Sequence, residues 1–472
     1  MKLPYKINDP FSIEQYAKKL LNKSLKDVIG DKAVQERVGK GKFGQLIEEL
    51  FFQYLPNSQP RADFEEAGME LKTTPLKKIR KGLVSKERLV FNIIDYKEEY
   101  KYSFKESSFW RKNALLLLMF YLYEKEKFDI DYIFKIIRLW RFPAKDLKII
   151  KDDWEKIVQK IMDGKAHEIS EGDTFFLGAC TKGINKESMR DQPFSLIPAK
   201  QRAFSLKSKY LNFIIQQSLY EEVLPDDSEY EKILSEPEMQ IAAEPETLYT
   251  KAPFQEIEPI VKDLSEYRKQ ETFEELVIRK FIPFYGKSEN ELITNLNLIF
   301  DAKAKNKFEL IARAILGVKN KKIEEFEKAD VLMKTIRMEA NKSIKESMSF
   351  RQIQFKDIVD EEWEDSTWYD ELNRRFFFVI FQANENGEYL LKKVKFWSIP
   401  HADLNILEQV WLDTKVKIQK GDFEHFIKAS DERIGHIRPK GQDANDLMEA
   451  PDGTMQKKKC FWLNNSYLKQ FL

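Results

Sequence analysis

The alternation of apolar and polar side chains is clearest between residues 68 and 73. Met69 and Leu71 point to one side there, while Glu70 and Lys72 point to the other. This period of two is typical of a strand with one buried face. We therefore predict a strand that buries its apolar side and carries two charged side chains on the opposite side.

Other segments follow one of the two regular periods. Residues 88–94 read as a strand, and residues 114–123 are almost wholly apolar, which predicts a central strand. Residues 132–140 fit a strand and a short helix equally well. Apolar side chains at helical spacing predict helices at residues 11–21, 43–55 and 154–162.

One carboxylate interrupts the apolar side of the predicted helix 43–55. Glu48 falls between Phe51, Phe52 and Leu55 on the helical wheel. A carboxylate in that setting destabilises the fold unless a cation or another partner meets it. A residue at the flank of the stripe, whose carboxylate reaches solvent, is the equally weighted alternative.

Charged residues around the strand at 68–73 form a candidate metal site. Side chains at i and i+2 of a strand lie about 6.5 Å apart on one face, so Glu70 and Lys72 sit side by side. Asp63 would supply a second oxygen ligand from the preceding turn, and Lys112 stands just before the central strand. Because 33% of the residues are charged, spacing alone favours a solvated strand face.

Length and composition narrow the class of protein. A chain of 472 residues exceeds the size of one growing core, so two or three domains are expected. The net charge of +1 does not by itself indicate a nucleic-acid partner. With two cysteines and four histidines, a zinc site or a disulfide scaffold is unexpected, which indicates a cytoplasmic protein. We expect no signal peptide and no membrane partner, since the longest apolar run is too short to span a bilayer.

A change in composition divides the chain. Residues 221–266 are rich in Glu, Asp, Pro and Ser with little periodicity, which predicts an acidic linker. The predicted domains are therefore residues 1–220 and 267–472. A solvated tether is the favoured interpretation of the linker, and an inhibitory segment lying across a basic cleft is the alternative.

The two domains are copies of one another. Matching segments occur in the same order and at nearly constant spacing, which chance would not maintain. The matched pairs are residues 42–51 with 307–316, 63–73 with 325–335, 86–91 with 345–350, 154–164 with 411–421, and 204–206 with 461–463.

The second copy lacks the acids of the first. Arg313 stands at the position of Glu48 and Leu332 at that of Glu70, which leaves Glu325 as the remaining acid. A divalent cation needs several oxygen ligands, so this copy is predicted to be catalytically dead. It keeps basic residues near its end, which indicates a binding module; these are Arg438, Lys440 and Lys457 to Lys459.

Taken together, these motifs carry a family resemblance. The first copy resembles MutH, the nicking endonuclease of DNA mismatch repair, and the two-copy chain resembles the Sau-type restriction endonucleases that cut GATC. The motifs that carry it are residues 44–48, Asp63-Phe64 with 68–73, Lys112, Lys182 with 203–207, and residues 436–440 of the second copy.

The resemblance implies a fold and an activity. The fold is α/β, with two tandem PD-(D/E)xK nuclease-like domains, each a mixed sheet flanked by helices. The activity is Mg²⁺-dependent hydrolysis of double-stranded DNA at GATC. By position, Asp63 and Glu70 would hold Mg²⁺, with Glu48 as a further ligand or base. Lys72 would orient or deprotonate the attacking water, and Lys112 would support the scissile phosphate.

The resemblance also indicates residues that contact DNA. MutH has a tyrosine near the adenine methyl group that it senses, whereas Ser205 and Trp462 stand at this position here. We therefore expect no discrimination against adenine-methylated sites. The predicted DNA-contacting residues are Lys182, Arg202, Ser205 and Lys207 in the first copy, and Arg438, Pro439, Lys440 and Trp462 in the second.

For the second copy, the resemblance implies an effector domain that binds another GATC duplex and supports cutting by the first. We expect a monomer in solution that can dimerise on DNA. Two alternatives stay open: a nicking enzyme of mismatch repair activated by a partner, and a DNA-binding regulator without catalysis.

Overall fold

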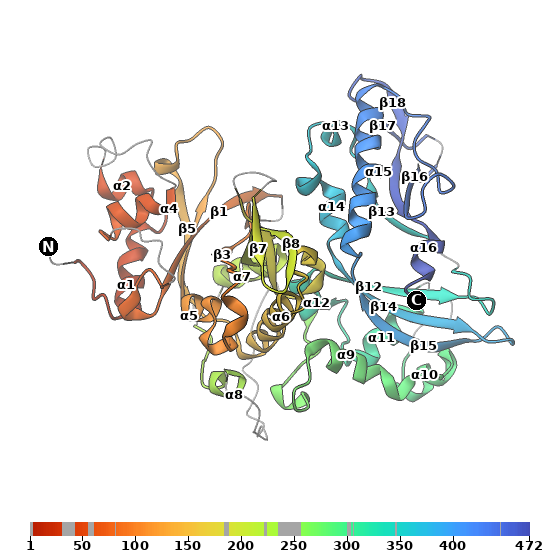
Figure 1. Ribbon diagram of the computed structural model, residues 1–472, viewed down its shortest axis with the longest axis horizontal. Helices are drawn as coiled ribbons and strands as arrows, with labels where there is room; N and C mark the ends of the chain where they lie inside the picture. Colours follow the sequence, from red (N-terminus) through yellow and green to blue (C-terminus); the bar gives the residue numbers. More distant parts are fainter. Residues whose placement is uncertain are drawn as a thin grey trace.

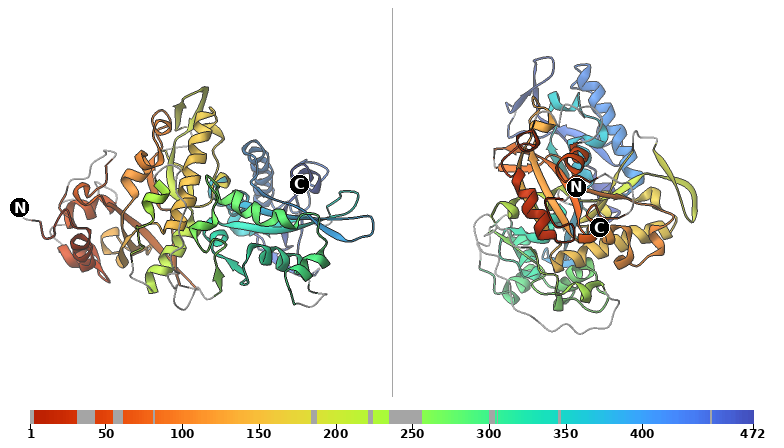
Figure 2. Two further views of the ribbon diagram at one scale, coloured as in Figure 1. Left: turned by 90° about the horizontal axis from the view of Figure 1, so that it is seen from below. Right: turned by 90° about the vertical axis from the view of Figure 1, so that its left-hand side faces the viewer.

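The computed structural model describes residues 3–30, 43–54, 61–80, 82–183, 188–220, 224–234, 256–299, 304, 306–344, 347–443 and 445–472. Two halves lie side by side along the long axis of the molecule, with the N-terminus at the outer end of the first half (Figures 1 and 2). None of the helices in the described ranges is long and apolar enough to cross a membrane.

The first half is built on a mixed sheet. Its strands run in the order β2-β1-β4-β5, with β1 parallel to β4 and β4 antiparallel to β5. The seven residues of β4 are mostly buried, as expected for a central strand. The bounds are β1 Glu70–Ile79, β2 Gly82–Ser85, β4 Leu116–Leu122 and β5 Ile133–Trp140. Residues 132–140, which fitted two interpretations, are therefore mainly strand.

Helices cover both faces of this sheet. Leu117 and Met119 of β4 pack against the N-terminal helices, whereas Leu116, Leu118 and Phe120 pack against the side that carries α6 and α7. The helices are α1 Pro10–Ala17, α2 Leu25–Ile29, α4 Phe43–Leu46, α5 Ser108–Asn113, α6 Ala144–Met162, α7 Ser208–Tyr220 and α8 Tyr230–Leu234.

A smaller antiparallel sheet and a hairpin complete the first half. The small sheet has the order β3-β9-β6, and β7 pairs with β8. Their bounds are β3 Val90–Ile93, β6 Leu177–Thr181, β7 Met189–Gln192, β8 Ser195–Lys200 and β9 Arg202–Leu206.

The second half repeats this plan. The mixed sheet has the order β12-β14-β15, with β12 parallel to β14, and the small sheet has the order β13-β19-β16. The long helices α6 and α15 are both 19 residues long. The strands are β12 Val331–Met338, β13 Met348–Gln352, β14 Arg375–Ala383, β15 Tyr389–Trp397, β16 Gly435–Pro439, β17 Leu447–Glu449, β18 Met455–Lys457 and β19 Lys459–Leu463.

The helices of the second half also flank its sheet. Phe377 and Val379 pack toward α9 and α11, while Phe376 and Phe378 pack toward α15. The helices are α9 Phe273–Phe281, α10 Glu289–Asn295, α11 Lys307–Leu316, α12 Glu324–Ala329, α13 Phe355–Ile358, α14 Thr367–Leu372, α15 His401–Gln419 and α16 Asn465–Lys469.

The described part of the predicted linker contacts both halves. Residues 224–234 carry α8, whose Tyr230 hydroxyl donates to the carbonyl oxygen of Phe142 in the first half. In the second half, β10, Ile257–Glu258, pairs in parallel with β11, Lys322–Ile323. Residues 221–223 and 235–255 of the predicted linker lie outside the described residues.

The halves share one hydrophobic core. Phe175 of the first half packs edge-on against Phe273 and Phe396 of the second, at ring-centroid distances of 5.1 and 5.2 Å. Beside them, the buried Lys328 ammonium lies 2.7 Å from a carboxylate oxygen of Asp146. The join is therefore both apolar and ionic.

The prediction of one buried face for the strand at 68–73 is wrong. Met69 and Leu71 are buried, and Glu70 on the opposite side is only 2% exposed. The side with Glu70 and Lys72 is covered by β3 and α5, because the Lys72 ammonium lies 6.0 Å from the Phe91 ring and 3.4 Å separates Lys112 Nζ from Glu70 Oε1. The acid therefore lies inside the protein.

Candidate active site

A tight turn places Asp63 over the first residue of β1. The backbone N–H of Leu71 donates to Asp63 Oδ2 at 2.9 Å, and the N–H of Asp63 donates to Glu70 Oε2 at 3.2 Å. Phe64 and Met69 close the turn by exchanging backbone hydrogen bonds, and Gly68 adopts a left-handed φ of 59°. The structure therefore brings together the two acids that the sequence pairs across seven positions.

Two ammonium groups converge on the same carboxylate. Lys72 Nζ lies 2.8 Å from Glu70 Oε1, and Lys112 Nζ lies 3.4 Å from the same atom. Lys72 comes from β1, two residues after Glu70, and Lys112 from the last turn of α5, which precedes β4. Because β1 and β4 are adjacent and parallel, with Glu70 opposite Leu116, both lysines lie where these two strands begin.

Glu48 joins this cluster from a helix that changes pitch. The α-helix Phe43–Leu46 continues as a π-helical turn, Ile47–Phe51, a distortion that occurs often at functional sites. Burial, followed by repulsion from Asp63 and Glu70, raises the pKa of Glu48 to about 7. The prediction that Glu48 meets other charged groups is consistent with this electrostatic coupling.

The acids repel one another. Burial, followed by the charge of Glu70, raises the pKa of Asp63 to about 7, although Lys72 and Lys112 act in the opposite direction. Two carboxyl groups thus titrate near neutral pH in the protein without a bound ion. Perturbed acids of this kind are typical of functional sites.

The donor chemistry of the cluster suits a hard cation. Carboxylate oxygens are the ligands that Mg²⁺ prefers, and a cation would relieve the repulsion that raises the pKa values of Glu48 and Asp63. Even so, within the described ranges no three His, Cys, Asp or Glu side chains stand in a metal-binding arrangement. Glu70 Oε1 is engaged by two ammonium groups and Oε2 by a backbone N–H.

Tyr54 is a further polar residue beside the acids, although the sequence pattern did not single it out. Its hydroxyl is buried and has no hydrogen-bond partner among the described residues. Burial, followed by the charges of Asp63 and Glu48, raises its pKa far above the usual range. The hydroxyl is therefore a further polar group beside the acids, and periodicity could not separate it from the apolar neighbours.

The predicted DNA-contacting residues of the first half are mostly covered. Lys182 is exposed, but Arg202, Ser205 and Lys207 are buried. Arg202 donates to the carbonyl oxygen of Ala179 at 2.7 Å, and the Lys207 ammonium donates to that of Glu171. These three side chains contact protein here, and their contact with DNA stays a prediction.

The corresponding residues of the second half are accessible. Arg438, Pro439 and Lys440 are exposed at the end of β16. The Arg438 guanidinium lies 3.7 Å from the centre of the Trp462 ring, and Lys440 Nζ lies 5.4 Å from it. An aromatic ring with two cations beside it is a suitable surface for a nucleic-acid backbone.

Among the described residues of the second half, the acids of the first site have no equivalent cluster. Arg313 is buried and pairs with Glu309 at 2.9 Å. The buried Glu325 carboxylate accepts hydrogen bonds from the backbone N–H groups of Ile260 and Val261, and burial raises its pKa to about 7. The remaining acid is therefore used to hold the chain before α9.

The fold and the cluster of Asp63, Glu70 and Lys72 define the class of the protein as a nuclease with MutH-like domains. The family described as DNA mismatch repair enzyme MutH matches residues 52–153 and, again, residues 316–409. The chain is 34% identical over 513 aligned positions to the type II restriction enzyme Sau3AI of Staphylococcus aureus, with 97% of each chain covered.

A second relative matches over a shorter region. The chain is 29% identical over 156 positions to the DNA mismatch repair protein MutH of Shewanella woodyi, covering 32% of this chain and 63% of that protein. Given the full-length match, this chain belongs to the family of MutH-like type II restriction endonucleases and is a site-specific deoxyribonuclease.

Proposed function

We propose that the first half cuts both strands of DNA at GATC in a Mg²⁺-dependent reaction. The observation that carries this proposal is the convergence of four side chains where β1 and β4 begin, namely Asp63, Glu70, Lys72 and Lys112. The choice of GATC rests on the resemblance to the Sau-type enzymes, and the restriction enzyme from Staphylococcus aureus supports cutting of both strands.

Each residue has a distinct role in this proposal. Asp63 and Glu70 would hold Mg²⁺, with Glu48 as a further ligand or base. The bound cation would draw charge from the phosphate in the transition state and lower the pKa of a coordinated water. Lys72 would orient or deprotonate the attacking water, and Lys112 would support the scissile phosphate. Both ammonium groups now lie on Glu70, so a phosphate oxygen would compete for them.

Substitution of the strand residues tests the catalytic assignment. Glu70→Ala and Lys72→Ala should each abolish cleavage of a GATC plasmid in Mg²⁺, while binding of a GATC duplex in EDTA remains. Glu66→Ala is the matched control, because Glu66 is an exposed acid in the same turn and should leave cleavage unchanged. Continued cleavage by the Glu70 or Lys72 variant would refute the assignment.

The form of the product separates two activities. Linear fragments in the plasmid digest would agree with a restriction enzyme that cuts both strands. Nicked circles would instead assign the chain to nicking enzymes such as the mismatch-repair relative.

We propose that the second half is a non-catalytic effector domain that binds another GATC duplex. The exposed Arg438 stacked on Trp462 supports this role, as does the use of Glu325 for backbone hydrogen bonds. An uncut GATC oligonucleotide should then accelerate cleavage of a plasmid with one site, and Arg438→Ala should abolish the acceleration. Acceleration of equal size in this variant would contradict the effector role.

A further inference from the structure

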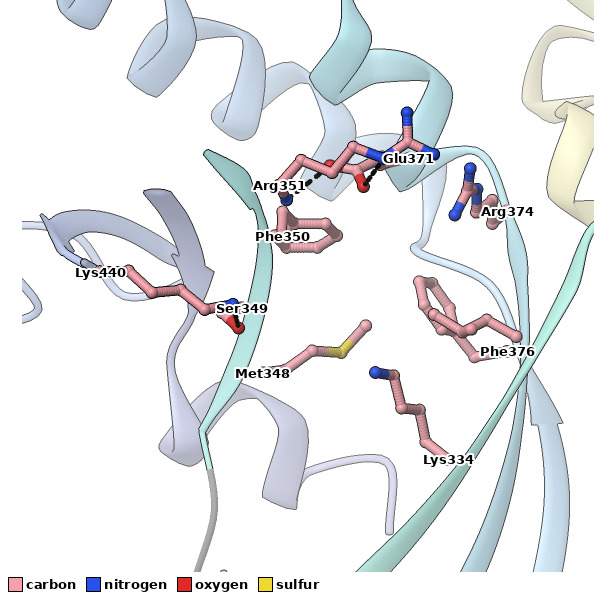
Figure 3. Close-up of a pocket in the computed structure, with 10 residues that line it drawn as sticks. Lys334, Met348, Ser349, Phe350, Arg351, Glu371, Arg374, Phe376 and Lys440 are labelled. Carbon is pink, nitrogen blue, oxygen red and sulfur yellow. Dashed lines mark hydrogen bonds and ion pairs between the residues drawn. The ribbon is translucent and has the colours of Figure 1, made fainter. Parts of the chain in front are cut away.

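A cationic cavity lies in the second half between β12, β13 and α14. It has a volume of about 300 Å³ and is lined by four basic residues, Lys334, Arg351, Arg374 and Lys440 (Figure 3). Glu371 is the acid in its lining. The lining therefore carries an excess of positive charge.

The cavity occupies the place that the catalytic cluster has in the first half. Leu332 pairs with Phe376 across parallel strands, as Glu70 pairs with Leu116, and Lys334 follows two residues later, as Lys72 does. Glu371 is the fifth residue of the six-residue helix α14, and Lys112 holds the same place in α5. The second half thus keeps the lysine of the strand and has Leu332 in place of the strand acid, while Glu371 of α14 is the acid in the lining.

The charges in the cavity are unequally neutralised. Glu371 is engaged by Arg351, whose Nε lies 3.3 Å from Oε1 and whose backbone N–H donates to Oε2 at 3.1 Å. Arg374 pairs with Asp330 at 3.0 Å, and Lys440 donates to the Ser349 hydroxyl at 2.6 Å.

Lys334 is the basic group without such a partner. Its ammonium points into the cavity and makes no hydrogen bond or ion pair with the residues that the structure describes (Figure 3). Burial, followed by repulsion from Lys440, lowers its pKa. An anion in the cavity would relieve this repulsion.

We propose that this cavity is a phosphate-binding pocket that holds one backbone phosphate of a duplex without a divalent cation. The inference rests on the proposed binding of DNA by the second half. At the catalytic site, carboxylates repel a phosphate and require a cation between them. In this pocket Leu332 replaces the strand carboxylate, and Arg351 offsets the charge of the remaining acid, Glu371. Lys334 and the guanidinium groups can then contact the phosphate directly.

The surroundings of the pocket suit a continuing backbone. A second, more open cavity of about 580 Å³ shares Arg351 and Lys440 with the first. It adds Gln352 and Gln354, each of which donates one side-chain N–H to a backbone carbonyl and keeps a second N–H that can donate to sugar and phosphate oxygens. It also adds Thr367, whose hydroxyl donates to Glu361 Oε1 at 3.1 Å.

Duplex binding by the full-length protein in EDTA tests the pocket. Lys334→Gln should weaken binding of a labelled GATC duplex about tenfold and reduce the salt-dependence slope by about one. Lys392→Gln is the matched control, because Lys392 is an exposed lysine on β15 of the same half and should change neither value. Thermal melting of both variants verifies that they are folded.

Neutral phosphates identify the group that enters the pocket. In a series of duplexes, each carries one methylphosphonate at a different position. At one position the methylphosphonate should weaken binding by the wild-type protein but should not weaken binding by Lys334→Gln any further. Full additivity at every position would overturn the proposal, as would binding by Lys334→Gln equal to that of Lys392→Gln.

Inorganic phosphate distinguishes the second source of the same chemistry. If Lys334→Gln loses binding of inorganic phosphate but keeps full duplex affinity, the pocket serves free phosphate and the assignment to DNA is overturned. The effector response of Arg438→Ala remains a separate test. If Arg438→Ala loses the effector response while Lys334→Gln binds the duplex with full affinity, the pocket alone is refuted. If Arg438→Ala keeps the effector response, the effector role is refuted.

Discussion

At the scale of single residues, the site is organised by crowding of like charges. Glu48, Asp63 and Glu70 come from a helix, a turn and a strand, and each raises the cost of ionising another. Lys72 and Lys112 offset part of this cost at Glu48 and Asp63. The unliganded cluster is therefore less stable when fully ionised than when it shares protons.

This crowding predicts a pH dependence of stability. The pKa of Asp63 rises from 3.8 to about 7 on folding, so the folded state binds more protons and its free energy of unfolding falls as the pH rises from about 4 to about 7. In EDTA, the free energy of unfolding of Asp63→Asn should therefore rise by about 1–2 kcal/mol relative to that of the wild-type protein between pH 5 and pH 8. Chemical denaturation at both values measures this.

The control for that experiment is Glu66→Gln in the same turn, which should follow the unsubstituted protein at both pH values. A parallel response of Asp63→Asn and Glu66→Gln would show that Asp63 does not titrate near neutral pH.

The sequence predicted these acids but not the surroundings of every candidate. Glu70 and Lys72 are two residues apart on one strand, so the period of the strand brings them together, and the turn just before that strand adds Asp63. Arg202 and Lys207 also lie in a recognisable motif, but their burial depends on distant segments that no local pattern contains. Tyr54 was missed because the hydrophobic period does not distinguish it from its apolar neighbours.

At the scale of elements, the turn between Asp63 and β1 fixes the geometry of the site. Gly68 has a left-handed φ of 59°, and the matching Asp330 of the second half has a φ of 53°. Both copies thus keep an unusual backbone conformation that glycine and aspartate tolerate better than most residues. The turn was conserved in form while the acid that follows it was exchanged for Leu332.

A β-branched residue in this turn should affect cleavage more than stability. Gly68→Val should lower the free energy of unfolding by about 1–2 kcal/mol, because the left-handed conformation is strained for valine. The substitution should also shift Asp63 relative to Glu70. Cleavage should therefore fall at least tenfold. Denaturation and plasmid digestion measure the two effects.

Gly317→Val is the comparison, since Gly317 also has a positive φ, of 79°, with open space at its Cβ position, and lies in the second half. A similar loss of stability with unchanged cleavage is expected there. Equal loss of cleavage in both variants would argue against a local role of the turn.

Elements were predictable where one period dominates. The apolar segment at 114–123 is the central strand β4, and helical spacing located α1. The segment 132–140 was ambiguous because β5 is buried on both faces, which removes the alternation that identifies strands. The helix at 43–55 breaks into an α and a π turn, which no hydrophobic period signals.

At the scale of the whole molecule, the two halves are joined by a buried ion pair within a shared core. The Lys328 ammonium contacts both carboxylate oxygens of Asp146, at 2.7 and 3.0 Å, and Tyr210 donates to the same carboxylate. Removing one partner of a buried pair leaves an uncompensated charge in the interior.

Lys328→Ala should therefore destabilise the protein by about 3–5 kcal/mol, and the two halves should become separable by limited proteolysis. The measurement is chemical denaturation at neutral pH. Lys127→Ala removes an exposed pair with Glu124 and should cost less than about 1 kcal/mol. If the two variants lost similar stability, the buried pair would not hold the halves together.

The packing of Phe175 against Phe273 and Phe396 has a consequence for the history of the gene. Once the halves had grown a common interior, a truncated descendant would have exposed these rings to water and left Asp146 without its lysine. Deletion of the second half would therefore destabilise the first half, whether or not the second half keeps the acids of a catalytic site. The duplication therefore resists reversal, because a chain shortened to the first copy would lose part of its own interior.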